Sequence, residues 1–495
     1  MVELFLGLDV GTSGARALLI DGDGKVAASA TESYPLATPQ PGWAEQDPLD
    51  WYRGSVTAIR RALEMVTGAS VRAVGLTGQM HSTVFLDGQD RPLRAAILWC
   101  DQRTAAQCDE ITARAGGLPG LLRLTSNRAL PGFTAPTILW VRQREPELFS
   151  SVRSILVGKD YVRYRLTGER VSDVSDASGT LLLDVRRRCL SEELLARLDL
   201  ERSLLFEVVE SAVVSGTITP QAARETGLAP GTPVVGGAGD QAAAAVGCGI
   251  IRDGIASISI GTSGVVFAAT SRPLEDEHGS LHVFCHAAPD LWHAMGVTLS
   301  AGGSVRWWRD VLAPAGGLGY PELDEEAQRV EPGASGLLFL PYLSGERTPV
   351  HDARARGVFF GLSLAHGRGH MMRAVLEGVC LALRSNLDLL HARGQAPSEI
   401  RLTGGGARSP LFRRILAEVL ECPLSTLEVD EGPALGAALL AAVGVGAVAD
   451  LGEACGRCVH VADRVVPSGS AAPAYREARA RFQELYERVK GLWPR

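Results

Sequence analysis

Gly11-Thr-Ser-Gly14 and Gly261-Thr-Ser-Gly264 are the same tetrapeptide, present once in each half of a chain of 495 residues. Each copy lies between two apolar runs. These runs are residues 4–10 and 15–20 in the first half, and 255–260 and 265–269 in the second. Two apolar runs joined by a Gly/Ser/Thr turn predict a β-hairpin, so we expect one hairpin near the start of each half.

Such turns expose backbone N–H groups and small hydroxyls, a surface that suits oxyanions and phosphates above all. A single copy would be an ordinary turn. Two copies in matched surroundings predict a duplicated domain, with a phosphate held between the two hairpins.

Composition narrows the class of protein. The chain is 46% hydrophobic and 21% charged, as in globular proteins, and its formal net charge of −7 without basic runs argues against nucleic-acid or membrane-surface partners. Nine cysteines without a framework, and no basic leader in Met1–Val10, predict a reduced cytoplasmic protein. We expect the uncharged run Gly432–Ala449, rich in Ala and Gly, to be a buried helix and loop rather than a membrane span.

Strand and helix signals alternate along both halves, which predicts an α/β protein of two domains, 1–245 and 246–495, with a catalytic cleft between them. Asp47-Pro48 predicts a helix start and Asp101 a helix cap. Further strands are expected at 25–33, 71–76, 234–235, 336–343 and 400–402, and further helices at 241–246, 370–390, 409–420 and 476–489.

Two aspartates stand beside glycine-rich turns. Asp9 precedes the first GTSG turn, where a carboxylate suits Mg²⁺ bound near phosphates, although a turn cap is the structural alternative. Asp240 follows Gly236-Gly-Ala-Gly239 and opens a predicted helix. Its structural alternative is a helix N-cap, and its chemical interpretation is a base that takes a proton from a sugar hydroxyl during phosphoryl transfer.

Other patterns leave alternatives open. Gly237–Ala242 matches GxGxxA between a strand and a helix, so a nicotinamide-dependent dehydrogenase has to be considered, although Asp253 lies too near for the usual ribose acid. No GxxxxGK[ST] motif is present. Cys455, Cys458 and His460 form at most an incomplete zinc pattern, with a surface loop as the favoured interpretation. The histidines 278, 282, 286 and 293 match no metal motif.

The motifs resemble the FGGY family of carbohydrate kinases almost end to end. Gly357-Val-Phe-Phe-Gly-Leu362 together with His370–Glu377 reads as the family's second signature, and Gly132–Val141 resembles the first, with Thr137 where Lys is usual. The resemblance implies the sugar kinase/actin/heat-shock ATPase fold.

Further motifs resemble the branch of the family that phosphorylates D-xylulose. They are 42–48, 78–81, 97–103, 131–136, 159–161, 172–177 and 341–349. By this resemblance Asp240 and Asp9 are the catalytic residues and face Mg²⁺. The sugar contacts are Met80, His81 and Asp240. The ATP contacts are Thr12, Ser13, Arg16, Thr262, Gly302, Gly405, Gly406 and Ala407.

The resemblance implies an enzyme that uses ATP and Mg²⁺ to phosphorylate a small ketose, D-xylulose. Its partners would include no nucleic acid and no membrane, and a homodimer is the assembly to test. Another sugar or polyol kinase of the family, such as a ribulose kinase, is the nearest alternative. A dehydrogenase and a non-catalytic actin-like ATP-binding module are the alternatives from other classes.

Overall fold

Both GTSG turns close β-hairpins in the computed structural model, which describes residues 2–312, 319–429 and 431–493. β1 (Val2–Val10) pairs antiparallel with β2 (Gly14–Ile20), and β16 (Ile255–Ile260) pairs antiparallel with β17 (Gly264–Thr270). Each turn is closed by the amide of its first glycine, which donates to a carbonyl oxygen 3.0 Å away. The two predicted hairpins are confirmed.

Each hairpin belongs to a seven-stranded sheet with the same local topology. In the first sheet β1 runs parallel to β5 (Ala69–Gly78), and β2 runs antiparallel to β3 (Val26–Ser33). The second sheet repeats this pattern with β16 parallel to β22 and β17 antiparallel to β19. The remaining strands of the two sheets are β13 (Val214–Thr217), β14 (Pro233–Val235), β15 (Ala238–Gly239), β18 (His282–Cys285), β19 (Trp292–Thr298), β22 (Glu399–Thr403), β23 (Leu424–Leu427) and β24 (Val461–Val465).

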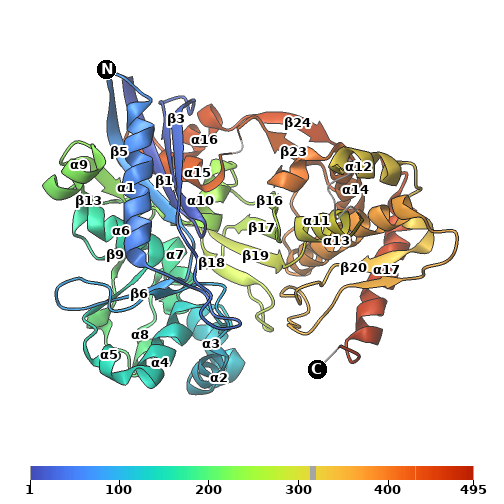
Figure 1. Cartoon of the computed structure of the whole chain (residues 1–495), viewed down its shortest axis with the longest axis horizontal. Coiled ribbons are helices and arrows are strands. Elements are labelled where there is room, and N and C mark those ends of the chain that lie inside the picture. Colours follow the sequence, from blue (N-terminus) through green and yellow to red (C-terminus); the bar gives the residue numbers. More distant parts are fainter. Residues whose placement is uncertain (1, 313–318, 430, 494–495) are drawn as a thin grey trace.

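Helices cover the sheets and complete a two-domain α/β fold (Figure 1). The helices of the first half are α1 (Pro48–Glu64), α2 (Ala105–Arg114), α3 (Gly117–Thr125), α4 (Thr134–Arg144), α5 (Pro146–Ser150), α6 (Gly158–Thr167), α7 (Val174–Ser178), α8 (Glu192–Arg197), α9 (Pro220–Thr226) and α10 (Asp240–Gly247). Those of the second half are α11 (Gly302–Leu312), α12 (Tyr320–Gln328), α13 (Arg368–His391), α14 (Pro410–Leu420), α15 (Gly432–Gly444), α16 (Leu451–Cys458) and α17 (Ala472–Val489). No helix in the described ranges is both long and apolar enough to cross a bilayer.

Small sheets complete the first half and support the second. β4 (Glu45–Gln46), β7 (Ala96–Ile97), β6 (Thr83–Leu86) and β8 (Ser154–Val157) form a four-stranded sheet in that order. The two-stranded pairs are β9 (Val171–Asp173) with β12 (Glu207–Val209), β10 (Leu183–Asp184) with β11 (Cys189–Leu190), and β20 (Leu338–Leu340) with β21 (Val358–Phe360).

Helix α15 returns from the second half to the sheet of the first. The approach is backbone to backbone: a Cβ on Gly7 of β1 would lie 1.9 Å from the Ala434 carbonyl oxygen, and one on Gly436 would lie 1.8 Å from that of Ala243. Only glycine fits at such distances. The expected buried helix in 432–449 is therefore confirmed, and it packs on β1, β5 and α10. The boundary between residues 245 and 246 stays a prediction.

Asp101 is not the helix cap that the sequence predicts. Helix α2 begins at Ala105 with Thr104 at the N-cap, whereas the Asp101 carboxylate is fully buried and accepts from the Ala44 amide and the Arg103 guanidinium. An acidic residue before a helix resembles a cap in sequence, but here a buried arginine binds it instead. The strand expected at 336–343 is also shorter, as β20.

Candidate active site

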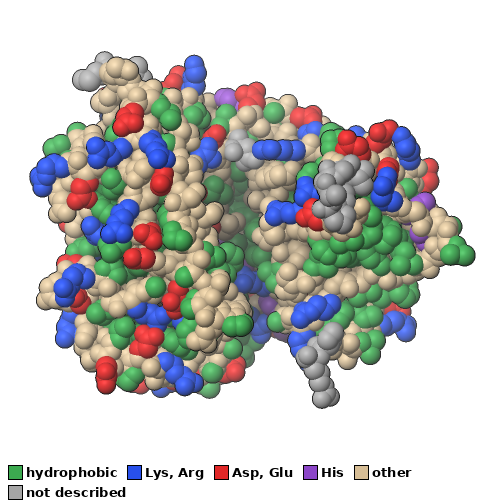
Figure 2. Space-filling model, in the orientation of Figure 1, with side chains coloured by type: hydrophobic (Ala, Val, Ile, Leu, Met, Phe, Trp, Pro, Cys, Tyr) green, Lys and Arg blue, Asp and Glu red, His purple; other side chains and the backbone are tan. Residues whose placement is uncertain are grey.

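The molecule is hollowed between its two halves, and basic and apolar side chains are visible within the hollow (Figure 2). An ion pair joins the two halves: Arg16 on β2 binds Glu431, the residue that precedes α15. Arg16 also donates from Nε to the Ser29 hydroxyl over 3.1 Å. Arg16, predicted to contact ATP, is thus also a tie between the halves.

The first hairpin turn is held by side chains from three separate segments. The Thr12 hydroxyl donates to Gln79 and accepts from the Trp99 indole, each over 3.0 Å. Gln46 Nε2 donates to the Thr12 carbonyl oxygen over 2.7 Å. The neighbouring Ser13 side chain is exposed. Thr12 is therefore fixed by the protein itself, and the backbone of the turn together with Ser13 is what remains open to a ligand.

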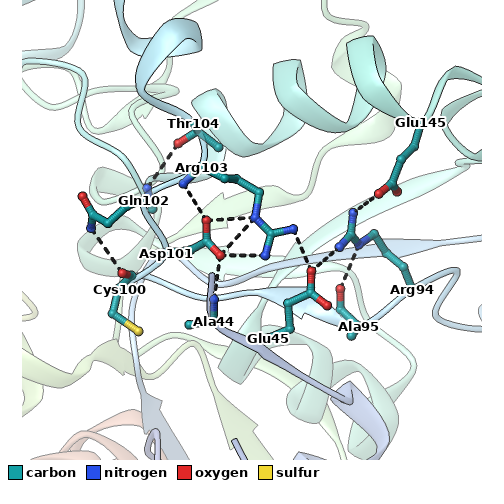
Figure 3. Close-up of polar contacts among 11 residues, drawn as sticks. Ala44, Glu45, Arg94, Ala95, Cys100, Asp101, Gln102, Arg103, Thr104 and Glu145 are labelled. Carbon is teal, nitrogen blue, oxygen red and sulfur yellow. Dashed lines mark hydrogen bonds and ion pairs between the residues drawn. The ribbon is translucent and has the colours of Figure 1, made fainter. Parts of the chain in front are cut away.

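A largely buried ion network links the segments around this region (Figure 3). The Arg103 guanidinium binds Asp101 and Glu45, each over 2.7 Å, and Arg94 binds Glu45 and Glu145, each over 2.6 Å. Arg103 also lies over the Trp43 ring, 3.5 Å from its centroid. The network ties 42–48 to 97–103, two of the motifs quoted above, and so positions the segment that carries Trp99.

The second hairpin borders a cavity of about 1220 Å³ in the second half. Gly302, the first residue of α11, donates its amide to the Gly261 carbonyl oxygen over 3.0 Å, and a Cβ there would lie 2.4 Å from that oxygen. Four residues predicted to contact ATP line the cavity: Thr262, Gly302, Gly405 and Gly406. Ala407 instead packs against the core beside it. The cavity is open, glycine-rich on one side and large enough for a nucleoside.

Asp9 and the residue before Asp240 lie on strands that flank the same neighbour, β5. On one side of β5, Asp9 pairs with Thr77; on the other, Gly239, which precedes Asp240, pairs with Gly78. Burial, and then the negative charge of Asp240, raise the pKa of Asp9 to about 7 against the effect of Arg16. Burial raises the pKa of Asp240 to about 6, against hydrogen bonds from Gln241. Two carboxylates of raised proton affinity thus lie at one edge of the sheet, a pattern that is common at catalytic sites.

Asp240 is not the N-cap of the helix that follows it. Gly239 occupies the N-cap position of α10, and Asp240 is the first helical residue. The N-cap alternative for Asp240 is therefore wrong by one position. Carboxylates here are energetically unfavourable at neutral pH, since burial disfavours their charge.

This burial predicts a change in stability with pH. A folded-state pKa raised to about 7 stabilises the fold while Asp9 is protonated, and that contribution is lost as pH rises from about 4 through 7. Without Mg²⁺, Asp9→Asn should therefore be more stable than the parent at pH 8, by on the order of 4 kcal/mol, and of nearly the same stability as the parent at pH 4. Scanning calorimetry in EDTA at both pH values measures this. Equal melting temperatures at pH 8 would contradict a buried Asp9.

Met80 and His81 lie where β5 passes into β6. Met80 is buried, and His81 adopts φ 71°, a left-handed conformation uncommon for residues other than glycine. His81 stacks on Phe133 with ring centroids 4.3 Å apart, and its Nδ1 lies 2.5 Å from the Gly179 carbonyl oxygen. Burial lowers the pKa of His81 to about 4, although the Gly179 contact opposes this. The ring is thus neutral near pH 7, and its Nδ1 must carry the proton, which leaves Nε2 as an acceptor.

The second half contributes residues near His81 that the sequence did not single out for this role. His282 and Phe284 on β18 pack with Phe133, at centroid distances of 6.0 and 6.4 Å. Besides burial, the positive charge of Arg347 helps to lower the pKa of both His81 and His282. Its guanidinium makes no ion pair within the described residues. The only sequence signal for it was its place in the 341–349 motif.

The incomplete zinc pattern is not a site in this structure. Cys455 and Cys458 are buried on helix α16, so the expected surface loop is wrong. Across the part of the chain that the structure describes, no three His, Cys, Asp or Glu side chains converge as a metal site. The histidines 282, 286 and 293 are buried among aromatic rings.

Comparison with known proteins identifies the family. Residues 4–247 match the N-terminal domain of the FGGY family of carbohydrate kinases, and residues 256–445 match the C-terminal domain. The chain is 41% identical over 491 residues to the xylulose kinase of Escherichia coli K12, covering 99% of this chain and 100% of that protein.

Solved structures agree. A protein of Brucella ovis described as a xyloylose kinase superposes with a TM-score of 0.92 at 38% identity, covering 99% of this chain and all of that one. The gluconate kinase of Lactobacillus acidophilus superposes with a TM-score of 0.95 at 27% identity, covering 100% and 99%. The fold is therefore common to kinases of different sugars, and the dehydrogenase alternative from Gly237–Ala242 is wrong.

Proposed function

This chain belongs to the FGGY family of carbohydrate kinases, and we propose that it transfers the γ-phosphoryl group of ATP to D-xylulose, giving ADP and D-xylulose 5-phosphate. The main support for D-xylulose as the substrate is the full-length similarity to a xylulose kinase, at 41% identity over 491 residues. It is supported by the Met80-His81 pair beside the two aspartates, in the motif that suggested this branch from sequence.

Asp240 is the base in this proposal. Its carboxylate accepts the proton of the sugar's terminal hydroxyl as the oxygen attacks the γ-phosphorus and the bond to the β-phosphate oxygen breaks. Burial raises the pKa of Asp240 to about 6, so the group is mostly ionised at pH 7 yet more basic than an exposed aspartate. A cleft that closes on the sugar would keep water from competing for the phosphoryl group.

The nucleotide is assigned to the two hairpins and the cavity beside the second. The adenosine would lie against Gly405 and Gly406, and the phosphates would run past Thr262 and Gly302 towards the first turn, where Ser13 and Arg16 lie. Backbone amides and small side chains allow the close approach that phosphates require. Ala407 would support this surface from beneath.

Mg²⁺ fits the two carboxylates. Asp9 and Asp240 offer oxygen ligands in a half-buried place, and Mg²⁺ is usually held by one or two carboxylates together with substrate phosphates. When bound, it would neutralise the charge that develops on the phosphates. Asp9 would be the principal ligand, which leaves Asp240 to the proton.

A sugar is assigned to the side of Met80 and His81. The Met80 side chain offers an apolar surface to the carbon chain, and His81 Nε2 accepts a hydrogen bond from a sugar hydroxyl. We include in the proposal a cytoplasmic location and a homodimer.

Initial rates with ATP and a panel of D-xylulose, D-ribulose, L-ribulose, gluconate and glycerol test the substrate. We expect kcat/KM to be highest for D-xylulose. A preference of about tenfold or more for another acceptor would overturn the sugar while leaving the family unchanged.

A further inference from the structure

Helix α7 is a five-residue element, and all of its residues are buried. It is short, yet it contacts both the segment that carries Asp240 and the one that carries His81. No sugar or nucleotide contact is assigned to it.

One end of α7 holds the turn before Asp240. The Ser175 hydroxyl accepts from the Gly239 amide over 3.0 Å and donates to Asp173 Oδ2 over 2.5 Å. The amides of Gly236 and Gly237 are instead held by backbone carbonyls of 211–213. Ser175 is thus the side chain that fixes the backbone immediately before the proposed base.

The other end of α7 meets the sugar side. Its C-cap residue, Gly179, accepts from His81 through its carbonyl oxygen. A Cβ on Gly179 would lie 2.6 Å from His81 Cε1 and 2.9 Å from Met80 Cε, so there is no room for another residue. The same helix therefore sets where His81 and Met80 sit.

A buried lysine anchors α7 through its N-cap residue. Lys159 Nζ lies 2.9 Å from Asp173 Oδ1, 2.6 Å from Asp160 and 3.4 Å from Asp176, and all four side chains are fully buried. The Ser211 hydroxyl donates to the same Asp173 oxygen as Ser175, over 3.0 Å. An ion pair and hydrogen bonds in a buried place restrict motion strongly, because any displacement leaves charges unpaired.

We propose that Ser175 is a positioning residue for phosphoryl transfer: through its hydrogen bond to Gly239 it fixes Asp240 relative to the sugar held by His81, on a helix that Lys159 and Asp173 anchor. The inference rests on the proposed function. It assigns Ser175 no contact with the substrate. Its loss should therefore lower turnover rather than binding, because a base displaced by about 1 Å can cost roughly 100-fold in rate.

The test compares Ser175→Ala with Ser211→Ala. Both variants lose a buried hydroxyl that donates to Asp173 Oδ2. Only Ser175→Ala also loses the hydrogen bond from the Gly239 amide. We expect Ser175→Ala to lower kcat by about 10- to 100-fold, with KM for ATP and the Kd of 5-deoxy-D-xylulose, which lacks the reacting hydroxyl, changed less than about threefold. Ser211→Ala should lower the melting temperature similarly and keep kcat within about threefold.

Ser172→Ala is the neutral control, since that buried hydroxyl has no partner among the described residues. Ser175→Cys keeps the volume with a weaker acceptor and should give an intermediate kcat. If Ser175→Ala does not fold, the cysteine variant carries the test alone. A kcat of either Ser175 variant within about twofold of the parent, or an equal loss in Ser211→Ala, would overturn the proposal. All ratios are measured with the sugar that the parent prefers, so a wrong sugar would be seen separately in the parent.

Discussion

Replacing Asp240 with asparagine is expected to lower turnover by about 10²- to 10⁴-fold, the contribution of a general base. Asparagine keeps the shape of the side chain but cannot take the proton of the sugar hydroxyl. Binding of ATP and of the sugar should survive nearly unchanged, because the hairpins and His81 are untouched. Steady-state rates and calorimetric titrations with each ligand separate the two effects.

Asp253→Asn is the matched control. It changes an exposed aspartate in the following loop, the residue that a dinucleotide site would have used. We expect its turnover to stay within about twofold of the parent. If Asp240→Asn keeps more than about a tenth of the parent's turnover, Asp240 is not the base and its burial at the start of α10 is structural.

The hairpins could be predicted because their signals are local. An apolar run, a GTSG turn and a second apolar run fix the strand pair within some 20 residues, and each half carries its own copy. Strands were also expected within β5 and β22, but their parallel pairing with the hairpins was not predicted. Asp9 and Asp240 stood out through local signals too, since each adjoins a glycine-rich turn.

What the sequence could not give were contacts between distant segments. Helix α15 lies on the first sheet although it follows α14 of the second half, and nothing in its Ala-rich sequence indicates which sheet it covers. Asp101 resembled a helix cap because the sequence does not show that Arg103 is buried. An exposed Arg103 would have left the Asp101 carboxylate free to cap the helix. Arg347 and His282 approach His81 only once the two halves are packed together, so no spacing reveals them.

The partners of the Thr12 hydroxyl also depend on contacts between distant segments. Its place in a GTSG turn suggests a direct phosphate contact. The hydroxyl is instead hydrogen-bonded to Gln79 and Trp99, which lie far along the chain. Thr262, in the second copy, accepts instead from Arg306 over 3.2 Å, on the exposed side of the turn. Identical tetrapeptides therefore have different surroundings, and the sequence of the turn does not fix the partners of its side chains.

Replacing His81 is expected to change which sugar is used. Sugar hydroxyls are discriminated by buried polar groups that lose their partners with the wrong substrate, an effect that can reach roughly 10⁴. His81→Ala should lower kcat/KM for D-xylulose by about 100-fold and change KM for ATP little. His81→Asn provides the sharper test, because its amide can still donate to the Gly179 carbonyl oxygen and tolerates the left-handed backbone, yet it lacks Nε2.

Rates over the same acceptor panel show whether His81 binds the sugar or only stabilises the fold. If Nε2 accepts from the sugar, both variants lose the preference for D-xylulose over its epimers while ATP binding persists. His286→Ala is the matched control, a buried histidine that packs on Phe267 instead of at the sugar side, and it should lower the melting temperature without altering the preference. An asparagine variant that keeps the parent's preference would show that His81 acts only through Gly179. The choice of sugar would then have to come from other residues. Arg347 of the second half is one candidate, because its guanidinium can only donate hydrogen bonds and the carbonyl of an open-chain ketose can only accept them.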